Sequence, residues 1–217
     1  MSRLAAPRPA TVYAIADAEA LGPRGLAEGA EAMAQAGVRT IQLRAKRLPD
    51  ADFYREAERC LRALAGWDGT LWVDDRVDFA TILPFSGVQL GQLDLPPGAA
   101  RLVLPPDALV GASSHDEPQW SRAHADQAVD WIAVGPVFPT SSKSRPDPVI
   151  GLEGLSDLAR RAFKMGPERK PLIAIGGIDA QSLPRVLALG ADSAAVLSAV
   201  CVGDVEENCR RLLQAAG

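Results

Sequence analysis

The 217-residue sequence has little of what nucleic-acid-binding, membrane or secreted proteins need. It has no excess of basic residues, since 23 Lys and Arg stand against 27 Asp and Glu, and the net charge is -4. This argues against a general nucleic-acid-binding protein, which presents a basic face. No apolar run approaches the roughly 20 residues that span a bilayer, and residues 1–10 lack the apolar region of a signal peptide. We therefore expect a cytoplasmic protein with no membrane partner.

Cysteine and histidine are also scarce. The three cysteines lack the C-x-x-C spacing and cannot all pair, so we expect them to be reduced and mostly structural; they are Cys60, Cys201 and Cys209. Two histidines, His115 and His124, are too few for a histidine-rich metal site. No G-x-S-x-G motif is present, and the adjacent residues Ser114 and His115 do not make a hydrolase triad, which excludes nucleophilic hydrolysis.

What the sequence does contain is a regular alternation of short apolar strands and helical patterns. Several strands are apolar almost throughout, as expected for a parallel sheet covered on both faces. Eight strands are predicted, at residues 11–17, 40–45, 71–76, 87–92, 109–115, 131–138, 171–178 and 193–200. Helical patterns are predicted at 23–36, 50–65, 116–128, 152–164, 180–189 and 204–215. The segments after the third and fourth strands are short, and prolines limit any helix there.

Eight strand–helix units in a chain of this length predict an α/β fold, a single (β/α)8 TIM barrel over residues 1–217. No linker or low-complexity tract suggests a second domain. An open, doubly wound sheet is the alternative, but eight regular units favour closure. The longest connector, residues 139–151, is rich in hydroxyl and basic side chains, and long loops in compact domains are often functional.

The predicted second strand carries polar residues towards its end. In (β/α)8 barrels the active site lies at the C-terminal ends of the strands. A period of two places Gln42, Arg44 and Lys46 on one face, towards the barrel mouth. Two cations in a partly closed pocket need an anionic partner, because an unpaired buried charge is costly. A diphosphate would meet this need, and so would an ion pair with an aspartate that follows the third or fourth strand.

Aspartates do follow the third and fourth strands. Adjacent strand residues face opposite ways, so Asp74 and Asp75 can both enter the pocket only if the third strand has already ended. Asp94 follows the fourth strand. One carboxylate from each of these neighbouring strands makes a candidate Mg²⁺ site, since Mg²⁺ takes a few carboxylates together with waters and phosphate oxygens. The alternative is an internal ion pair with a nearby cation.

Hydroxyl groups and glycines follow the later strands. Ser113 at the end of the fifth strand is a candidate for substrate binding, whereas Ser114 is expected to cap the next helix, a role that Asp116 also suits. The glycine pair at 176–177 lets backbone amides approach a ligand closely, although glycine pairs also serve tight turns. Ser198 ends the eighth strand. Loops after the last two strands often bind phosphate in this fold.

The loop after the sixth strand is the richest in such groups. Thr140, Ser142 and Lys143 supply hydroxyl donors and a cation suited to diphosphate oxygens. An exposed connector is the simpler reading of this loop alone. Taken together, the strand ends predict two anionic groups in one pocket, one of them helped by a divalent metal, and therefore two phosphorylated substrates.

With these motifs the chain resembles the thiamine phosphate synthase family over about residues 11–201. The segments that carry the resemblance are IQLRAK, DDRVDFA, GVQLGQLDLP, GASSH, GPVFPTSSK and AIGGI, of which GPVFPTSSK is the most specific. The resemblance implies a Mg²⁺-dependent transferase of thiamine biosynthesis. Such an enzyme joins hydroxymethylpyrimidine diphosphate to hydroxyethylthiazole phosphate and releases thiamine phosphate and pyrophosphate. Analogy with the fold also suggests a possible homo-oligomer.

The resemblance assigns roles to residues at these positions. Gln42 would contact the pyrimidine, and Asp75 and Asp94 would bind Mg²⁺. The catalytic groups would be Arg44, Lys46, Lys143 and Ser113. The other substrate-binding residues would be Asp74, Thr140 and Ser142 on the diphosphate side and Gly177, Val196 and Ser198 at the thiazole phosphate.

Two positions depart from the family pattern. Asp74 stands where the family has asparagine, and a carboxylate there would repel the diphosphate unless it adds a metal contact. Gln89 replaces a histidine; its strand parity is opposite to that of Gln92, so we expect this change to matter little. Two alternatives to the synthase stay open. One is a thiazole tautomerase-like paralogue, in which the histidine at position 115 would transfer a proton. The other is a non-catalytic barrel that binds a thiamine precursor.

Overall fold

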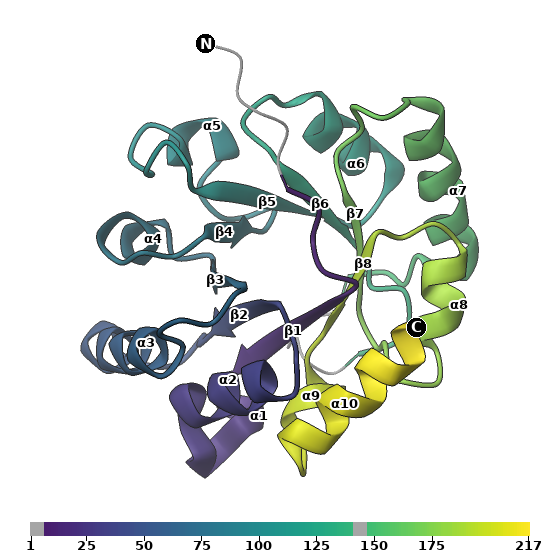
Figure 1. Ribbon diagram of the computed structural model, residues 1–217. Helices are drawn as coiled ribbons and strands as arrows, with labels where there is room; N and C mark the ends of the chain where they lie inside the picture. The colour runs from purple at the N-terminus through teal and green to yellow at the C-terminus, as the bar shows by residue number, and fades with distance from the viewer. Residues whose placement is uncertain (1–6, 141–146) are drawn as a thin grey trace.

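Eight parallel strands close into a barrel, in the order β1 to β8 with β8 pairing back onto β1. The computed structural model describes residues 7–140 and 147–217. Figure 1 looks into this barrel, with the helices arranged around the outside of the strands. The strands are β1 (Val12–Asp17), β2 (Thr40–Arg44), β3 (Thr70–Asp74), β4 (Gly87–Leu90), β5 (Leu109–Ser114), β6 (Trp131–Val134), β7 (Leu172–Ile175) and β8 (Ser193–Val196). The predicted closed (β/α)8 barrel is therefore confirmed.

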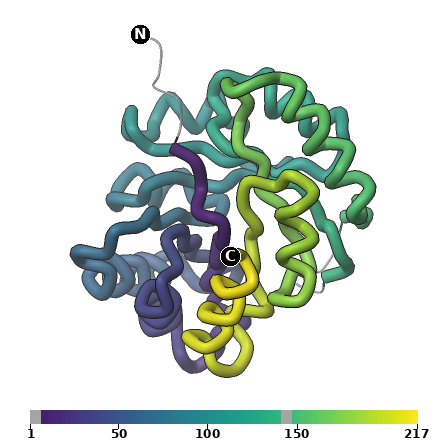
Figure 2. Tube along the Cα trace, turned by 45° about the vertical axis from the view of Figure 1, so that its right-hand side comes forward, coloured from purple at the N-terminus to yellow at the C-terminus, as the bar shows by residue number. Residues whose placement is uncertain are grey.

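Each strand is followed by helical structure that returns the chain to the other end of the barrel. After β1 come α1 (Ala18–Leu21), the 3-10 helix η1 (Gly22–Arg24) and α2 (Gly25–Gln35). The next strands are followed by α3 (Asp50–Ala63), α4 (Val77–Ile82), α5 (Pro97–Ala100), α6 (Glu117–Ala125), α7 (Gly151–Lys164) and α8 (Leu183–Ala188). After β8 come α9 (Ser198–Cys201) and α10 (Val205–Ala216). Figure 2 shows the N-terminal strand lying beside the last strand, where the barrel closes.

The ends of several strands differ from the sequence-based expectation, whereas the short helices after β3 and β4 match it. The eighth strand ends at Val196, and Ser198 opens the short helix α9 instead of ending the strand. The helices after β3 and β4 are only six and four residues long. Prolines limit both segments, as expected, because proline cannot continue a helix interior. Within the described residues, no helix has both the length and the apolar character needed to cross a membrane.

The strand residues divide between two apolar layers. Alternate residues such as Ile41 and Leu43 on β2 are fully buried between the barrel and the helices. The opposite parity fills the barrel interior, where Trp72 and Trp131 stack with ring centroids 4.3 Å apart and Tyr13 packs against both rings. Because these aromatic side chains fill the middle of the interior, polar residues of the same parity gather at the strand ends, with Thr40 and Thr70 at the N-terminal ends and Arg44 and Asp74 at the C-terminal ends.

Candidate active site

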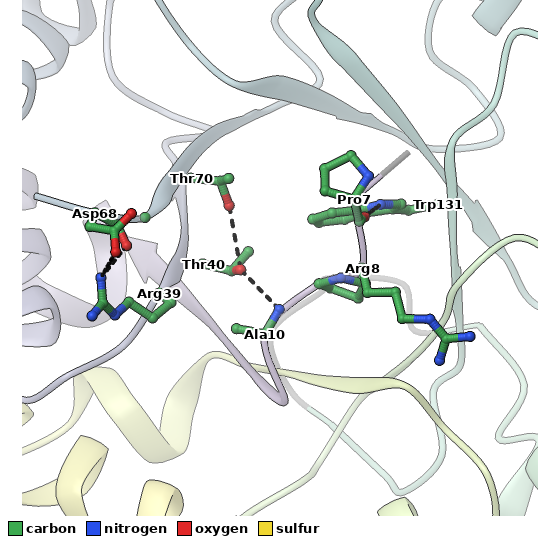
Figure 3. Close-up of a pocket in the computed structure, with 10 residues that line it drawn as sticks. Pro7, Arg8, Ala10, Arg39, Thr40, Asp68, Thr70 and Trp131 are labelled. Carbon is green, nitrogen blue, oxygen red and sulfur yellow. Dashed lines mark hydrogen bonds and ion pairs between the residues drawn. The ribbon is translucent and has the colours of Figure 1, made fainter. Parts of the chain in front are cut away.

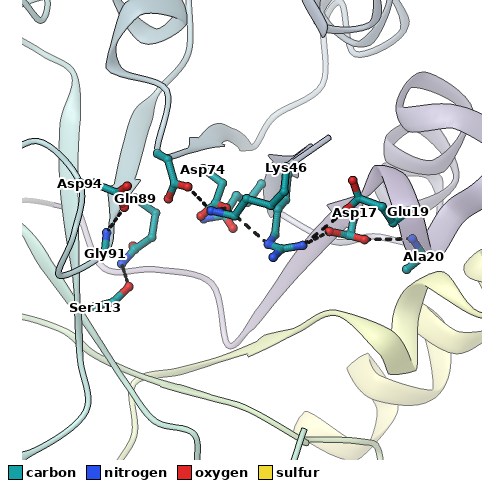
Figure 4. Close-up of polar contacts among 12 residues, drawn as sticks. Asp17, Glu19, Ala20, Lys46, Asp74, Gln89, Gly91, Asp94 and Ser113 are labelled. Carbon is teal, nitrogen blue, oxygen red and sulfur yellow. Dashed lines mark hydrogen bonds and ion pairs between the residues drawn. The ribbon is translucent and has the colours of Figure 1, made fainter. Parts of the chain in front are cut away.

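Arg44 ends β2 between two carboxylates that come from the neighbouring strands. Asp17 ends β1 directly opposite Arg44 in the strand register, and the Arg44 guanidinium donates to its carboxylate through Nη1. On the other side, Arg44 Nε lies 3.4 Å from Asp74 Oδ2 at the end of β3. Asp17 also caps α1 by accepting a hydrogen bond from the Ala20 amide at 2.9 Å. The guanidinium is thus fixed from both sides by Asp17 and Asp74, the two carboxylates that are labelled in Figure 4.

Lys46 lies two residues beyond Arg44 and faces the same way. Its Nζ is 2.9 Å from Asp74 Oδ2 and also forms an ion pair with Asp75. Burial lowers the pKa of Lys46, but the carboxylates of Asp74 and Asp75 outweigh burial, and the net pKa is raised. The side chain therefore stays charged at neutral pH. The ion pairs that the sequence analysis gave as one alternative are therefore present, and they lie at the barrel mouth, where the other alternative places a diphosphate.

Asp74 and Asp75 both face this mouth because β3 ends at Asp74. Asp75 has φ 62°, a left-handed conformation that aspartate tolerates better than most non-glycine residues. The Asp75 amide donates to the Gln89 carbonyl at 2.8 Å, which holds the turn against β4. The turn breaks the strand alternation, so two consecutive carboxylates reach the same lysine. Such a conformation is characteristic of functional sites.

Asp94 lies close to Asp75. Its Oδ2 accepts a hydrogen bond from the Gly91 amide at 2.7 Å, which anchors the loop after β4. Burial raises the pKa of the Asp94 carboxyl, and the neighbouring carboxyl of Asp75 raises it further. Among residues 7–140 and 147–217, no group of three or more Asp, Glu, His or Cys side chains is placed to hold a metal. Asp75 and Asp94 are a pair of neighbouring carboxylates.

Gln42 lies one layer below the cations. Its side chain is buried, and Nε2 donates to the Tyr13 hydroxyl at 2.9 Å. Burial raises the pKa of Tyr13 well above its usual value, and the charge of Asp74 raises it further. The phenol is therefore neutral and available as an acceptor for the Gln42 amide. Tyr13 was not singled out from the sequence, because a tyrosine in an apolar strand reads as a core residue.

Ser113, on β5, is held by two glutamines. Its Oγ accepts from Gln89 Nε2 at 3.1 Å, and its carbonyl accepts from Gln92 Nε2 at 2.6 Å. The expectation that Gln89 matters little, because its strand parity is opposite to that of Gln92, was therefore wrong. Gln92 lies beyond Leu90, the last residue of β4, where strand alternation no longer applies. Gln89 is buried inside the barrel and in contact with a candidate substrate residue.

The helix cap after β5 also differs from expectation. Asp116 caps α6 by accepting from the Gln119 amide at 2.7 Å, whereas the buried Ser114 hydroxyl makes no cap. Ser114 belongs to β5 itself, two residues before the cap position, so it cannot reach the first free amides of the helix. His115 Nδ1 lies 2.7 Å from the Gly135 carbonyl, and Nε2 lies 3.4 Å from Asp147 Oδ2.

The glycine pair after β7 is explained by close packing. A Cβ on Gly176 would lie 2.5 Å from Pro136, and one on Gly177 would lie 2.6 Å from the Pro139 carbonyl oxygen. Both glycines also have positive φ, of 100° and 63°. They let the loop after β6 lie directly against the loop after β7, as the 3.0 Å bond from the Phe138 amide to the Gly176 carbonyl shows.

Other predicted residues of this region fall into three groups. Thr140 is described at the start of the loop after β6, whereas Ser142 and Lys143 lie outside the described residues. Val196 is buried in the layer between barrel and helices, so a contact with a ligand in the mouth would have to come from its backbone. Ser198 opens α9, two residues beyond the end of β8, and is exposed.

Two cavities lie on different faces of the barrel. A cavity of about 220 Å³ lies between the loop after β4 and α6; Asp94 and Gln92 line it on one side and Gln119 and Arg122 on the other. A larger one of about 330 Å³ lies at the N-terminal ends of the strands, under Thr40, Thr70 and Trp131 (Figure 3). The polar groups at that end are engaged, as in the ion pair between Arg39 and Asp68. We place the active site at the C-terminal ends, where such barrels carry their chemistry.

The structure is a (β/α)8 barrel with cations and carboxylates gathered at the C-terminal ends of its strands, which is where enzymes of this fold have their active sites. Comparison with known proteins identifies the family. The thiamine monophosphate synthase family matches residues 12–200. Thiamine-phosphate synthases of Koribacter versatilis and Methanoculleus marisnigri are 38% and 42% identical, covering 94% and 82% of this chain and the same shares of their own lengths.

A solved structure agrees with these relatives. The thiamine phosphate pyrophosphorylase from Pyrococcus furiosus superposes with a TM-score of 0.82 at 31% identity and covers 95% of each chain. The chain belongs to the thiamine monophosphate synthase family. The resemblance that the sequence motifs predicted is thereby confirmed across nearly the whole barrel.

Proposed function

We propose that this protein is a thiamine-phosphate synthase. It joins hydroxymethylpyrimidine diphosphate to hydroxyethylthiazole phosphate and releases pyrophosphate, which makes it a transferase. Family membership over residues 12–200 supports the reaction, and the single structural observation that carries it is the cluster of Arg44, Lys46, Asp74, Asp75 and Asp94 at the barrel mouth. A homo-oligomer in the cytoplasm is part of the proposal and rests on the sequence and on analogy with the fold.

The reaction exchanges one bond for another at the pyrimidine methylene carbon. The bond from this carbon to the diphosphate oxygen breaks, and its electron pair leaves with pyrophosphate. The thiazole nitrogen then supplies its lone pair to the same carbon and becomes a thiazolium cation. No proton has to move in this exchange, so the site requires no general base. What it does require is stabilisation of the negative charge that grows on the leaving group.

Arg44 and Lys46 are placed to stabilise that charge. Both are held at the mouth by carboxylates from β1 and β3, which fixes them before a substrate arrives. Preorganised cations stabilise a developing anion without reorganisation at the moment of bond breaking. In this proposed role, the diphosphate oxygens accept hydrogen bonds from these two side chains and from Lys143.

Asp75 and Asp94 fit a Mg²⁺ ion. They offer oxygen ligands and lie close to each other; burial raises the pKa of the Asp94 carboxyl, and the neighbouring carboxyl of Asp75 raises it further. A set of only two carboxylates suits Mg²⁺, which keeps waters and takes substrate phosphate oxygens as further ligands. When bound, Mg²⁺ would neutralise part of the charge on the diphosphate leaving group.

The remaining proposed roles concern the two substrates. Gln42 would meet the pyrimidine, oriented by its hydrogen bond to Tyr13. Ser113 would line the same pocket, held by Gln89 and Gln92. The other proposed pocket residues are Thr140, Ser142 and Asp74 on the diphosphate side and Gly177, Val196 and Ser198 at the thiazole phosphate.

A paired-variant assay tests this function. Purified protein is mixed with both substrates and Mg²⁺, and thiamine phosphate and pyrophosphate are quantified. We expect the two products in equal amounts and only when both substrates are present. Asp94→Ala should abolish turnover with the fold intact, whereas Asp78→Ala, at an exposed carboxylate paired with Arg76, should retain it. Near-normal turnover of Asp94→Ala would refute the proposed metal site, and metal-independent isomerisation of a thiazole would favour the tautomerase-like alternative.

A further inference from the structure

Asp74 contacts both of the cations proposed to bind diphosphate. A single carboxylate oxygen, Oδ2, lies 2.9 Å from Lys46 Nζ and 3.4 Å from Arg44 Nε. The Asp74 side chain is 13% exposed and comes from the last residue of β3, whose backbone is fixed by pairing with β4. The carboxylate is therefore held in place between the two cations.

Other carboxylates of the mouth share these cations: Asp17 and Glu19 lie beside Arg44, and Asp75 lies beside Lys46. Asp17 pairs with Arg44 and caps α1, and Asp94 accepts from the Gly91 amide and faces Asp75. Asp74 contacts both Arg44 and Lys46. An anion that binds these cations must therefore approach a fixed negative charge that already uses the same donors.

We propose that Asp74 is an internal competitor of pyrophosphate, which holds Arg44 and Lys46 in position while weakening their grip on diphosphate groups. This inference rests on the proposed function. Its consequence is a site in which the cations are well ordered and the pyrophosphate product is released readily. Asp74 acts through the two cations. It is a positioning residue and needs no contact with the reacting atoms.

Electrostatics give the direction of the effect. A like charge a few ångströms from a bound anion disfavours binding, and low exposure weakens solvent screening of that repulsion. Asparagine has the same shape as aspartate and keeps one acceptor oxygen for Lys46, but it carries no charge. Asp74→Asn should therefore leave the two cations in place and remove the repulsion.

The test measures binding of inorganic pyrophosphate in the presence of Mg²⁺ by isothermal titration calorimetry. We expect Asp74→Asn to bind pyrophosphate at least fivefold more tightly than the unmodified protein. Asp74→Glu, which keeps the charge, should bind within about twofold of the unmodified protein. Asp78→Asn changes the net charge equally at an exposed position away from the two cations and should also stay within about twofold. Asp74→Ser serves as a second variant should the asparagine variant fail to fold.

A second readout separates competition from metal binding. Mn²⁺ affinity without pyrophosphate, followed by electron paramagnetic resonance, should change by less than about threefold in Asp74→Asn. A tenfold loss would make Asp74 a metal ligand and overturn the inference. Unchanged or weaker pyrophosphate binding by Asp74→Asn, with normal binding by the unmodified protein, would overturn the inference alone. If neither protein bound pyrophosphate with Mg²⁺, the proposed function would fall together with it.

Discussion

Replacement of Arg44 by methionine would leave two poorly exposed carboxylates without their shared cation. The Asp17 side chain is 4% exposed and that of Arg44 is 15% exposed. Removal of one partner from a buried ion pair costs about 3–5 kcal/mol, because it leaves an uncompensated charge. Since Asp74 keeps Lys46 as a partner, we expect the lower end, about 3 kcal/mol. In a domain of this size that corresponds to a fall in Tm of about 6–12 °C.

A double variant separates stability from function. Asp17→Asn removes the unpaired charge and keeps a good N-cap residue for α1. The Asp17→Asn/Arg44→Met protein should therefore regain about 2 kcal/mol relative to Arg44→Met alone, as a coupling between contacting residues. Thiamine phosphate formation should stay about 10²–10³-fold reduced in both, because the guanidinium is absent. Thermal unfolding followed by circular dichroism, with a turnover assay, gives both quantities. Additive losses in Tm, or normal turnover without Arg44, would refute the reasoning.

Three other outcomes follow from the structure. Gly176→Ala should lower stability by about 1–3 kcal/mol, because φ is 100° and a Cβ would lie 2.5 Å from Pro136. Chemical denaturation measures this loss, and an unchanged midpoint would contradict the close packing at Gly176. Burial raises the pKa of Asp94, and Asp75 raises it further, so the folded state holds this proton more tightly than the unfolded state does. As the pH rises through that pKa, ionisation of Asp94 therefore lowers the stability of the folded state. Asp94→Asn should therefore raise Tm at pH 7 and have a smaller effect at pH 4; a larger gain at pH 4 would reverse the sign. Burial raises the pKa values of Cys60, Cys201 and Cys209 to about 12, 11 and 12. The folded protein should therefore resist a thiol-specific reagent at pH 8, and the unfolded protein should react at three thiols per chain. Labelling of the folded protein would contradict this expectation.

The barrel could be predicted because its signal is repeated. Eight apolar strands separated by helical patterns leave few alternatives, and each strand of the structure lies within or next to its predicted range. The period of two also placed Gln42, Arg44 and Lys46 on one side, since β2 is regular up to Arg44. The ends of strands were harder to place, because apolar residues continue past β6 and β8 into turns and α9.

The residues that the sequence could not assign depend on turns and on cross-strand register. Asp75 reaches Lys46 only because it adopts a left-handed conformation, which no periodicity reveals. Asp17 ends a strand that looks like pure core, and its pairing with Arg44 follows from register. The contact of Gln89 with Ser113 was missed because parity was counted past the end of β4. In each case the decisive information lies between strands and not along them.

We propose that the carboxylates and cations at the barrel mouth carry out synthesis of thiamine phosphate. The most direct test follows thiamine phosphate formed from hydroxymethylpyrimidine diphosphate and hydroxyethylthiazole phosphate, with Mg²⁺ and, in parallel, with a chelator. The account predicts product with Mg²⁺, none with the chelator, and recovery when Mg²⁺ is added back. Absence of product from folded protein with Mg²⁺, or equal product in the chelator, would contradict it.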